Sequence, residues 1–187
     1  MYKFNQKRIL QVVCGTDYTV CLDEDHNVWS WGLGAFGNLG HGGTLDEYFP
    51  KQVETLAGKV VRHISAGAKH TLAVTLKGDL WAFGSCEDGR LGNGELHGFA
   101  LYPQRIEGVL EGVIVCQADA GEAHSGAVDT TGSCYTWGAG SYGRLGHGEN
   151  LGETMPVRIH DLELKFCSSI LCSAFHSMVV TSEGQVS

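Results

Sequence analysis

Three histidines at nearly regular spacing are the residues whose type and pattern most directly suggest chemistry. His70, His124 and His176 stand 54 and 52 residues apart, and a threonine or serine follows each of them. Three imidazoles that converge on one point can hold a zinc ion at about 2 Å. Equivalent residues of successive structural repeats lie too far apart for three of them to reach one ion at that distance. We therefore predict no metal site and expect each histidine to hydrogen-bond a turn within its own repeat.

Glycine-rich segments supply a second chemical motif. Residues 32–37 and 138–143 both satisfy G-x-G-x-x-G, which binds a dinucleotide when a helix follows it. The first copy continues N-L-G-H-G-G, which cannot start a stable helix, and the middle copy has Cys86 in place of the second glycine. We predict no nucleotide or other cofactor here, and instead tight loops held by the inward-packing residues Leu39, Leu91 and Leu145.

Catalytic groups do not recur in a recognisable arrangement of nucleophile, base and orienting residue. The neighbouring carboxylates Asp23, Glu24 and Asp25 precede a strand and are expected to be solvated turn residues. We therefore predict no catalytic residue in this chain.

The seven cysteines form no C-x-x-C pair and suggest neither a disulfide framework nor a zinc site. Four of them align with small or apolar residues of other repeats, which indicates buried apolar packing: Cys14, Cys21, Cys134 and Cys172. Cys86 stands beside two acidic residues, which disfavour a reactive thiolate.

One glycine-rich pattern, W-G-x-G-x-x-G-x-L-G-x-G in its fullest form, occurs three times. Its first glycines are 52 and 54 residues apart, and three prolines follow at steps of 53. A period near fifty residues is typical of stacked units or propeller blades, none of which buries its apolar face alone. We assign the following repeated positions to structure: Trp31, Gly32, Gly37, Leu39, Gly40, His70, Phe83, Gly84, Gly89, Leu91, Gly92, His124, Trp137, Gly138, Gly143, Leu145, Gly146 and His176.

Each repeat has the pattern of four short strands. In the second repeat, apolar runs at 60–66, 71–76 and 79–84 are separated by glycine-containing turns. A fourth run contains a proline, which lacks the N–H that a central strand needs, so we expect it at the edge of its sheet. Aromatic pairs such as Trp81 and Phe83 share one face of the third strand, and this indicates blade core instead of a photochemical or ligand-stacking role.

Together, the glycine-rich pattern, the proline strand and the G-x-x-H-[TS] turn resemble the regulator-of-chromosome-condensation repeat family over residues 9–187. The resemblance implies an all-β fold made of antiparallel four-stranded blades from a seven-bladed β-propeller. This chain would form three blades and half of a fourth. We divide it into an N-terminal extension (1–8), three repeats (9–58, 59–112 and 113–164) and the first half of a fourth repeat (165–187).

The chain stops at Ser187, which aligns with the aromatic residues Trp81 and Tyr135. We expect it to be a fragment of a longer protein. Two alternatives stay open: the chain is an alternatively terminated product, or a second copy completes the arc. Completion by a second copy would cover the strand edges that an open arc exposes.

Composition limits the classes of partner. A formal net charge of −8 and a pI near 5.5 argue against direct binding to nucleic-acid phosphates. The first eight residues lack the apolar run of a signal peptide, and no stretch of the sequence approaches the ~20 apolar residues that cross a bilayer. We therefore expect a cytoplasmic or nuclear protein without a membrane partner.

Candidate partner-binding residues lie in the loops that differ most between repeats. The connections after each L-G-x-G carry acidic residues and no lysine or arginine, so a shared rim of them would favour a basic partner. With the neighbouring glycine-rich loop, the candidates are Asp46, Glu47, Glu87, Asp88, Glu95, Glu149 and Glu153.

These observations favour a non-catalytic protein-interaction scaffold within a larger regulatory protein. Its partner would be a small GTPase or a histone-like protein. The resemblance also implies guanine-nucleotide exchange on a Ran-like small GTPase, but in the family that activity depends on a wedge inserted beyond the repeat, and intervals of 52 to 54 residues leave no room for one. Ubiquitin ligation by a longer protein would need a catalytic cysteine, for which residues 1–187 offer no recognisable setting.

Overall fold

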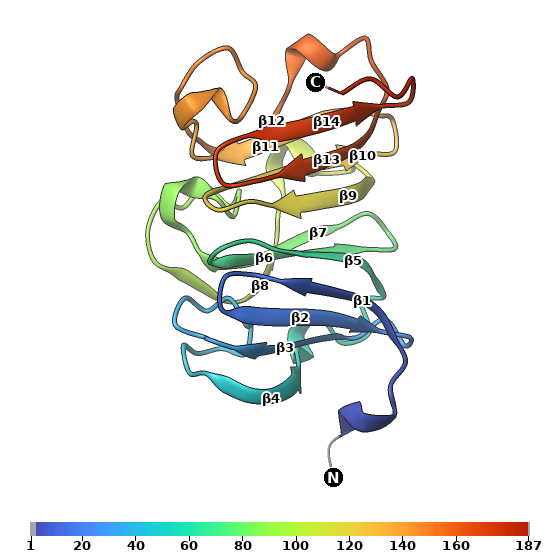
Figure 1. Ribbon diagram of the computed structural model, residues 1–187, viewed down its shortest axis with the longest axis vertical. Coiled ribbons are helices and arrows are strands. Elements are labelled where there is room, and N and C mark those ends of the chain that lie inside the picture. Colours follow the sequence, from blue (N-terminus) through green and yellow to red (C-terminus); the bar gives the residue numbers. More distant parts are fainter. Residues whose placement is uncertain (1–2, 187) are drawn as a thin grey trace.

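The computed structural model describes residues 3–186, which form four antiparallel sheets in chain order (Figure 1). The first contains β1 (Ile9–Cys14), β2 (Tyr18–Asp23), β3 (Val28–Gly32) and β4 (Glu47–Gln52). The second contains β5 (Val61–Ala66), β6 (His70–Thr75), β7 (Leu80–Ser85) and β8 (Phe99–Arg105). The third contains β9 (Val115–Ala120), β10 (His124–Asp129), β11 (Cys134–Gly138) and β12 (Glu153–Arg158), and the fourth β13 (Cys167–Cys172) and β14 (Ser177–Thr181).

Short 3-10 turns are the only helical elements within residues 3–186: η1 (Lys3–Gln6), η2 (Glu54–Leu56), η3 (Glu87–Gly89), η4 (Gly108–Leu110), η5 (Ser141–Gly143) and η6 (His160–Leu162). None of them is long and apolar enough to cross a membrane. Met1, Tyr2 and Ser187, at the ends of the predicted extension and half repeat, lie outside the described residues.

Strand order confirms the predicted all-β fold of three blades and a half-blade. In each four-stranded sheet the strands pair in chain order, and β13 pairs with β14 in the fourth. Pro50, Pro103 and Pro156 lie in β4, β8 and β12, which are the edge strands, as predicted from their missing N–H groups.

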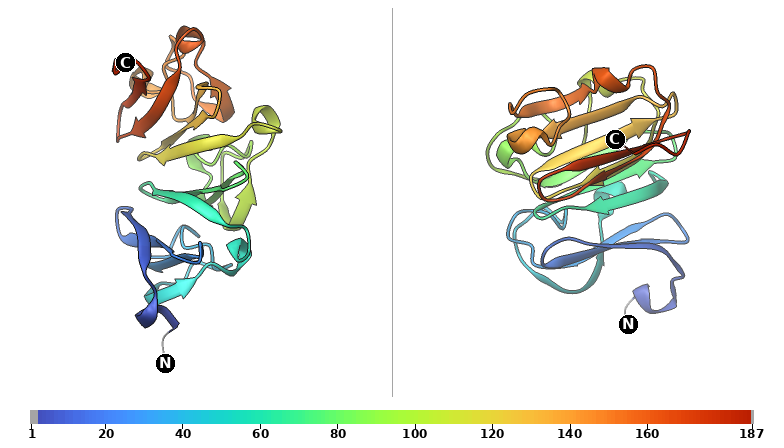
Figure 2. Two further views of the ribbon diagram at one scale, coloured as in Figure 1. Left: turned by 90° about the vertical axis from the view of Figure 1, so that its right-hand side faces the viewer. Right: turned by 45° about the horizontal axis from the view of Figure 1, so that its top comes forward.

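The first strands of the four sheets lie next to one another along the stack (Figure 2). Their side chains bond the backbone of the following sheet. Gln11 donates its amide to the Ile64 carbonyl at 2.9 Å and accepts the Ile64 N–H at 3.0 Å. Gln117 makes the same two bonds to Ile170, each 2.8 Å long. His63 holds the equivalent position in the second sheet and donates from Nε2 to a carbonyl of the third. These bonds fix the register of one sheet against the next.

The apolar core lies between consecutive sheets. We call the contacts between the first and second, second and third, and third and fourth sheets the first, second and third interfaces. Leu39 and Phe83 are buried at the first interface, Leu91 and Trp137 at the second, and Ile170 at the third. Each sheet therefore completes its core with side chains of its neighbour, as expected for units too small to fold alone.

One carboxylate departs from the prediction that Asp23, Glu24 and Asp25 are solvated. Asp23 is fully buried, whereas the other two are exposed. It accepts the Asn27 N–H and the Trp29 indole N–H, both at 2.9 Å. Burial raises the pKa of the Asp23 carboxyl, but the hydrogen bonds from Asn27 and Trp29 outweigh burial and hold this pKa below its usual range. Asp23 is thus an anion that closes a hairpin turn.

The cysteine prediction holds for Cys21 and Cys134, which are buried, and only in part for Cys172, which is half-buried. It is wrong for Cys14, which is exposed because β1 has a neighbouring sheet on one side only among residues 3–186. Cys86 is buried, and burial raises the pKa of its thiol, which keeps the thiolate scarce.

Candidate protein-binding face

The glycine-rich loops (residues 32–43, 84–94 and 138–148) lie on the left-hand side in Figure 1, which we call the loop face. Their leucines, Leu39, Leu91 and Leu145, are at most 1% exposed, as predicted. The second and third loops contain three-residue 3-10 turns where a dinucleotide site would need a helix. Backbone with positive φ explains the repeated glycines Gly32, Gly37, Gly40, Gly84, Gly89, Gly92, Gly138, Gly143 and Gly146.

His70 and His124 bond across interfaces, so the prediction of a bond within each histidine's own repeat is wrong for these two, whereas His176 is exposed. Fully buried His70 lies 2.8 Å through Nε2 from the hydroxyl of Ser125 in the third sheet. That hydroxyl donates its only proton to the Arg90 carbonyl at 2.7 Å, so it accepts from His70. Burial lowers the pKa of His70 to about 3, with a smaller contribution from Arg90, and keeps the ring neutral.

The other repeats vary this arrangement. His124 bonds Ser177 at 2.9 Å, and Ser177 donates to the Arg144 carbonyl at 2.8 Å. Burial lowers the pKa of His124 to about 4. In the first repeat Tyr18 replaces the histidine and donates to the His70 carbonyl at 2.5 Å. No group of three or more histidine, cysteine or acidic side chains within residues 3–186 is arranged to hold a metal ion.

Two arginines that the sequence analysis did not identify also cross interfaces. Arg90 is only 4% exposed and donates to the carbonyls of Glu87 at 2.8 Å and Glu122 at 3.1 Å. Arg144, 7% exposed, reaches the Ala174 carbonyl at 2.9 Å. The one sequence feature that the two arginines share is their position. Each directly precedes the repeated L-G, where the first copy has Asn38.

Two predicted acidic candidates are partly neutralised. Asp88 pairs with Arg90 at 2.8 Å, and Glu87 with Lys69 at 3.2 Å. The hydrogen bond from Lys69 lowers the pKa of the Glu87 carboxyl. Both bases lie outside the connections that the sequence analysis compared, so it did not find these pairs.

The first connection is similarly occupied. Asp46 accepts the Gly34 N–H at 2.9 Å, and Glu47 pairs with Lys51 on the same strand. Glu95 is exposed on the second connection. Of these residues, Glu47 therefore contributes less free negative charge than its carboxylate alone suggests.

The last two candidates come together. Glu149 and Glu153 line one pocket of about 230 Å³ with Asp161, His147 and His160. We call it the carboxylate pocket. Three carboxylates around one small hollow attract a cationic side chain.

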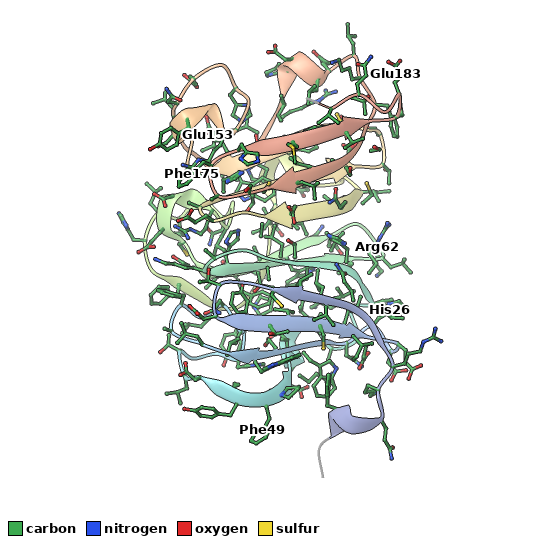
Figure 3. The ribbon with its side chains drawn as sticks, viewed as in Figure 1. His26, Phe49, Arg62, Glu153, Phe175 and Glu183 are labelled. Carbon is green, nitrogen blue, oxygen red and sulfur yellow. The ribbon has the colours of Figure 1, made fainter. Side chains whose placement is uncertain are left out.

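An exposed aromatic pair lies on the same face. Tyr142 and Phe175 are 78% and 56% exposed, their rings meet edge to face at 5.6 Å, and the Arg144 guanidinium lies against both. Tyr142 lines a shallow hollow with Glu149. Figure 3 shows Glu153 and Phe175 on the loop side, opposite Arg62 and Glu183. No sequence pattern marks this pair, because Tyr142 and Phe175 meet only after two repeats pack together.

Repeated four-stranded sheets joined by these cross-interface bonds define a propeller-type repeat protein. The profile of the regulator of chromosome condensation (RCC1) repeat matches residues 25–74, 77–128 and 131–180. The chain therefore belongs to the RCC1 repeat family. Each matched segment runs from the third strand of one sheet to the second strand of the next, and so crosses one interface.

Individual relatives cover the chain almost completely. It is 35% identical to the ultraviolet-B receptor UVR8 of Arabidopsis thaliana over 95% of its length, which is 40% of that receptor. The human WBSCR16 crystal structure superposes on the whole chain with a TM-score of 0.87 at 27% identity and is covered to 48%. Prp20p of Saccharomyces cerevisiae, which binds Gsp1p and histones, matches 91% of the chain with a TM-score of 0.78 at 25% identity and is covered to 43%. The chain thus spans less than half the length of these relatives.

Proposed function

We propose that this chain is a non-catalytic protein-interaction module whose loop face binds a basic segment of a partner protein. The observation that carries the proposal is the carboxylate pocket beside the Tyr142–Phe175 pair. A lysine or arginine side chain would enter between Glu149 and Glu153, and its apolar stem or neighbour would cover the rings. Histone binding by Prp20p, at 25% identity, supports a basic partner.

A binding titration tests this function. A fluorescein-labelled histone-tail peptide should bind the chain, and the double variant Glu149→Gln/Glu153→Gln should weaken binding about tenfold, the combined effect of two partly screened charges. The matched control is Glu183→Gln, an exposed carboxylate on the opposite side (Figure 3). Equal loss in the control, or no loss in the double variant, contradicts the proposal.

Nucleotide exchange is the alternative that the same protein preparation distinguishes. If the chain accelerates nucleotide release from a Ran-type GTPase at catalytic stoichiometry, it is an exchange factor and the non-catalytic proposal fails. If the chain binds the GTPase stoichiometrically without accelerating nucleotide release, the small GTPase is a binding partner and the non-catalytic proposal stands.

A further inference from the structure

Basic side chains without an ion pair gather on one side of the molecule. Among residues 7–186, Arg144 is the one such side chain on the loop face, where it is buried. The others lie at the opposite ends of the strands, near the turns that join the second and third strands of each sheet, and we call this side the turn face. Figure 3 labels one of them, Arg62. The unpaired bases of the turn face are Arg8, Lys59, Arg62, Lys77 and Lys165.

Three exposed aliphatic side chains form a strip across the second interface on the turn face. Val60, Leu76 and Ile114 are 41%, 62% and 51% exposed. The Leu76 N–H donates to the Val60 carbonyl at 2.9 Å, and the Gly78 carbonyl accepts the Val115 N–H at 3.1 Å. A Cβ on Gly78 would lie 2.6 Å from the Ile114 Cα. The turn at 76–78 therefore joins the aliphatic residues of the second sheet to that of the third.

Three of the unpaired bases border this strip. Lys59 and Lys77 are the chain neighbours of Val60 and Leu76. Arg62 is exposed at a β-bulge, where the register of β5 against β6 shifts, and a bulge re-aims the side chain of its extra residue. The strip and its bases form what we call the turn-face patch: Lys59, Val60, Arg62, Leu76, Lys77 and Ile114.

Strained backbone presents one of the aliphatic residues. Val60 has a φ of +51° and is the one β-branched residue with positive φ in residues 3–186. This conformation crowds a branched Cβ. Ile114, at the equivalent position of the third repeat, has no positive φ, so the repeat itself does not require the strain. Strained residues of this kind concentrate at binding sites, where the side chain that they present is used.

The patch lies in the interior of the stack. The second and third sheets contact each other, and each also contacts a further sheet on its other side (Figure 1). Exposure of the patch therefore does not depend on an uncovered end of the stack.

Charge on the rest of the turn face distinguishes two kinds of acidic partner. Exposed Glu24, Glu107 and Glu183 share this side of the molecule with the patch. A flat anionic membrane would meet these carboxylates together with the patch and be repelled by them, whereas a narrow protein segment contacts the patch alone. The charges therefore favour a protein segment.

We propose that the turn-face patch binds an acidic segment of a partner protein that also carries aliphatic side chains. The carboxylates of the segment pair with Arg62 and Lys77, and its aliphatic side chains cover Val60, Leu76 and Ile114. This site goes beyond the proposed basic-segment binding, because it lies on the side opposite the loop face and recognises the opposite charge.

A fluorescein-labelled synthetic peptide of sequence EDLIEDLIED is the probe for fluorescence anisotropy. It should bind the chain saturably. A peptide of equal charge with serine in place of leucine and isoleucine should bind about tenfold or more weakly, and so should a peptide with glutamine in place of its acidic residues. Binding of the probe should weaken as salt rises, because its carboxylates face exposed bases.

Variants of the protein locate the site. Val60→Gly removes the side chain and relieves the strain, so it should weaken binding severalfold without lowering the urea midpoint of unfolding. Arg62→Gln/Lys77→Gln should weaken binding about tenfold and reduce its salt dependence. The matched controls are Leu164→Ala, at a fully exposed apolar residue outside the patch, and Lys51→Gln, at a base on an outer strand; both should leave binding unchanged.

Absence of saturable binding, equal binding of the serine peptide, or equal losses in the control variants overturns the proposal. So does binding of the unaltered chain to vesicles of phosphatidylserine and phosphatidylcholine that Arg62→Gln/Lys77→Gln abolishes, since the patch is then a membrane site. The histone-tail titration on the same variants should give unchanged affinity, and this separates the turn-face patch from the basic-segment site.

Discussion

The second and third interfaces of this protein use equivalent residues and reach different outcomes. At the second, Trp137 is fully buried between Gly92 and the leucine and isoleucine side chains around it. At the third, Gly146 and the same residue types surround a cavity of about 250 Å³. One sheet builds the pocket, and the third strand of the next supplies the aromatic side chain that fills it.

Polar contacts persist at the third interface, where no aromatic side chain of residues 3–186 occupies the equivalent position. Ser177 bonds the Arg144 carbonyl much as Ser125 bonds the Arg90 carbonyl, at 2.8 and 2.7 Å. The histidine, serine and arginine bonds thus align neighbouring sheets, whereas the fully buried aromatic ring adds apolar contact. Separate substitutions can test these two contributions.

The largest effect is expected from removing the aromatic residue at the filled interface. Trp137→Ala should lower the free energy of unfolding by about 3–5 kcal/mol, because a fully buried ring leaves a cavity. Trp31→Ala should cost clearly less, since Trp31 is half-buried and packs edge-on against Phe4. Urea unfolding measures both variants. Equal losses in the free energy of unfolding would show that a ring buried against a neighbouring sheet stabilises the fold no more than half-buried Trp31 does.

Alanine substitutions of Gly92 and Gly146 isolate the contribution of side-chain packing to stability. Gly92→Ala and Gly146→Ala impose similar backbone strain, with φ of +77° and +74°. At position 92 the new methyl group also collides with Trp137, whereas at 146 it meets Ile159 at an ordinary distance. We expect Gly92→Ala to be more destabilising by about 1–3 kcal/mol in urea unfolding. A Gly146→Ala variant of equal cost would mean that the cavity at the third interface is closed in solution.

Buried His70 predicts a pH dependence of stability. Its folded pKa of about 3 lies below the ordinary value of 6.5, so the unfolded chain takes up a proton that the folded chain does not. The stabilisation is therefore fully present above pH 6.5 and is lost as the pH falls from 6.5 toward 3, by about 1.4 kcal/mol per pH unit. His70→Gln should flatten that slope in urea midpoints measured across this range, and an unchanged slope would assign the effect to other groups.

The smallest effects are expected from the linking hydroxyls. Ser125→Ala leaves the Nε2 of fully buried His70 without a partner and should cost about 1–3 kcal/mol. Ser177→Ala should cost about 1 kcal/mol or less, because Ser177 is half-buried and water can replace it. Thermal unfolding of the two variants ranks them, and the reverse order would contradict the proposed difference in burial.

The sequence predicted what repeats locally. Strand-length apolar runs, the edge prolines and the inward-packing Leu39, Leu91 and Leu145 follow from period and residue type, because their causes lie within one repeat. Buried Asp23 was missed because an acidic residue in a turn is usually solvated, and only the fold brings the Trp29 indole to it.

Contacts between repeats were beyond the sequence analysis. The bonds from His70 to Ser125 and from Arg90 to Glu122 join residues separated by 55 and 32 positions, and nothing in one repeat identifies the partner in another. The acidic candidates illustrate the same limit. Counting carboxylates could not reveal that Glu87 pairs with Lys69 while Glu149 and Glu153 share a pocket.

Hydrogen exchange along the two matched first strands tests most directly whether an aromatic side chain closes each interface. β9 and β13 each pair with a single strand in their own sheet. The difference between their exchange rates therefore reports how firmly the contacts with neighbouring sheets hold each strand. We predict that residues 167–172 exchange about a hundredfold faster than residues 115–120, and that Trp137→Ala removes most of this difference. Equal exchange of the two segments in the unaltered chain, or a difference that survives Trp137→Ala, would contradict the account.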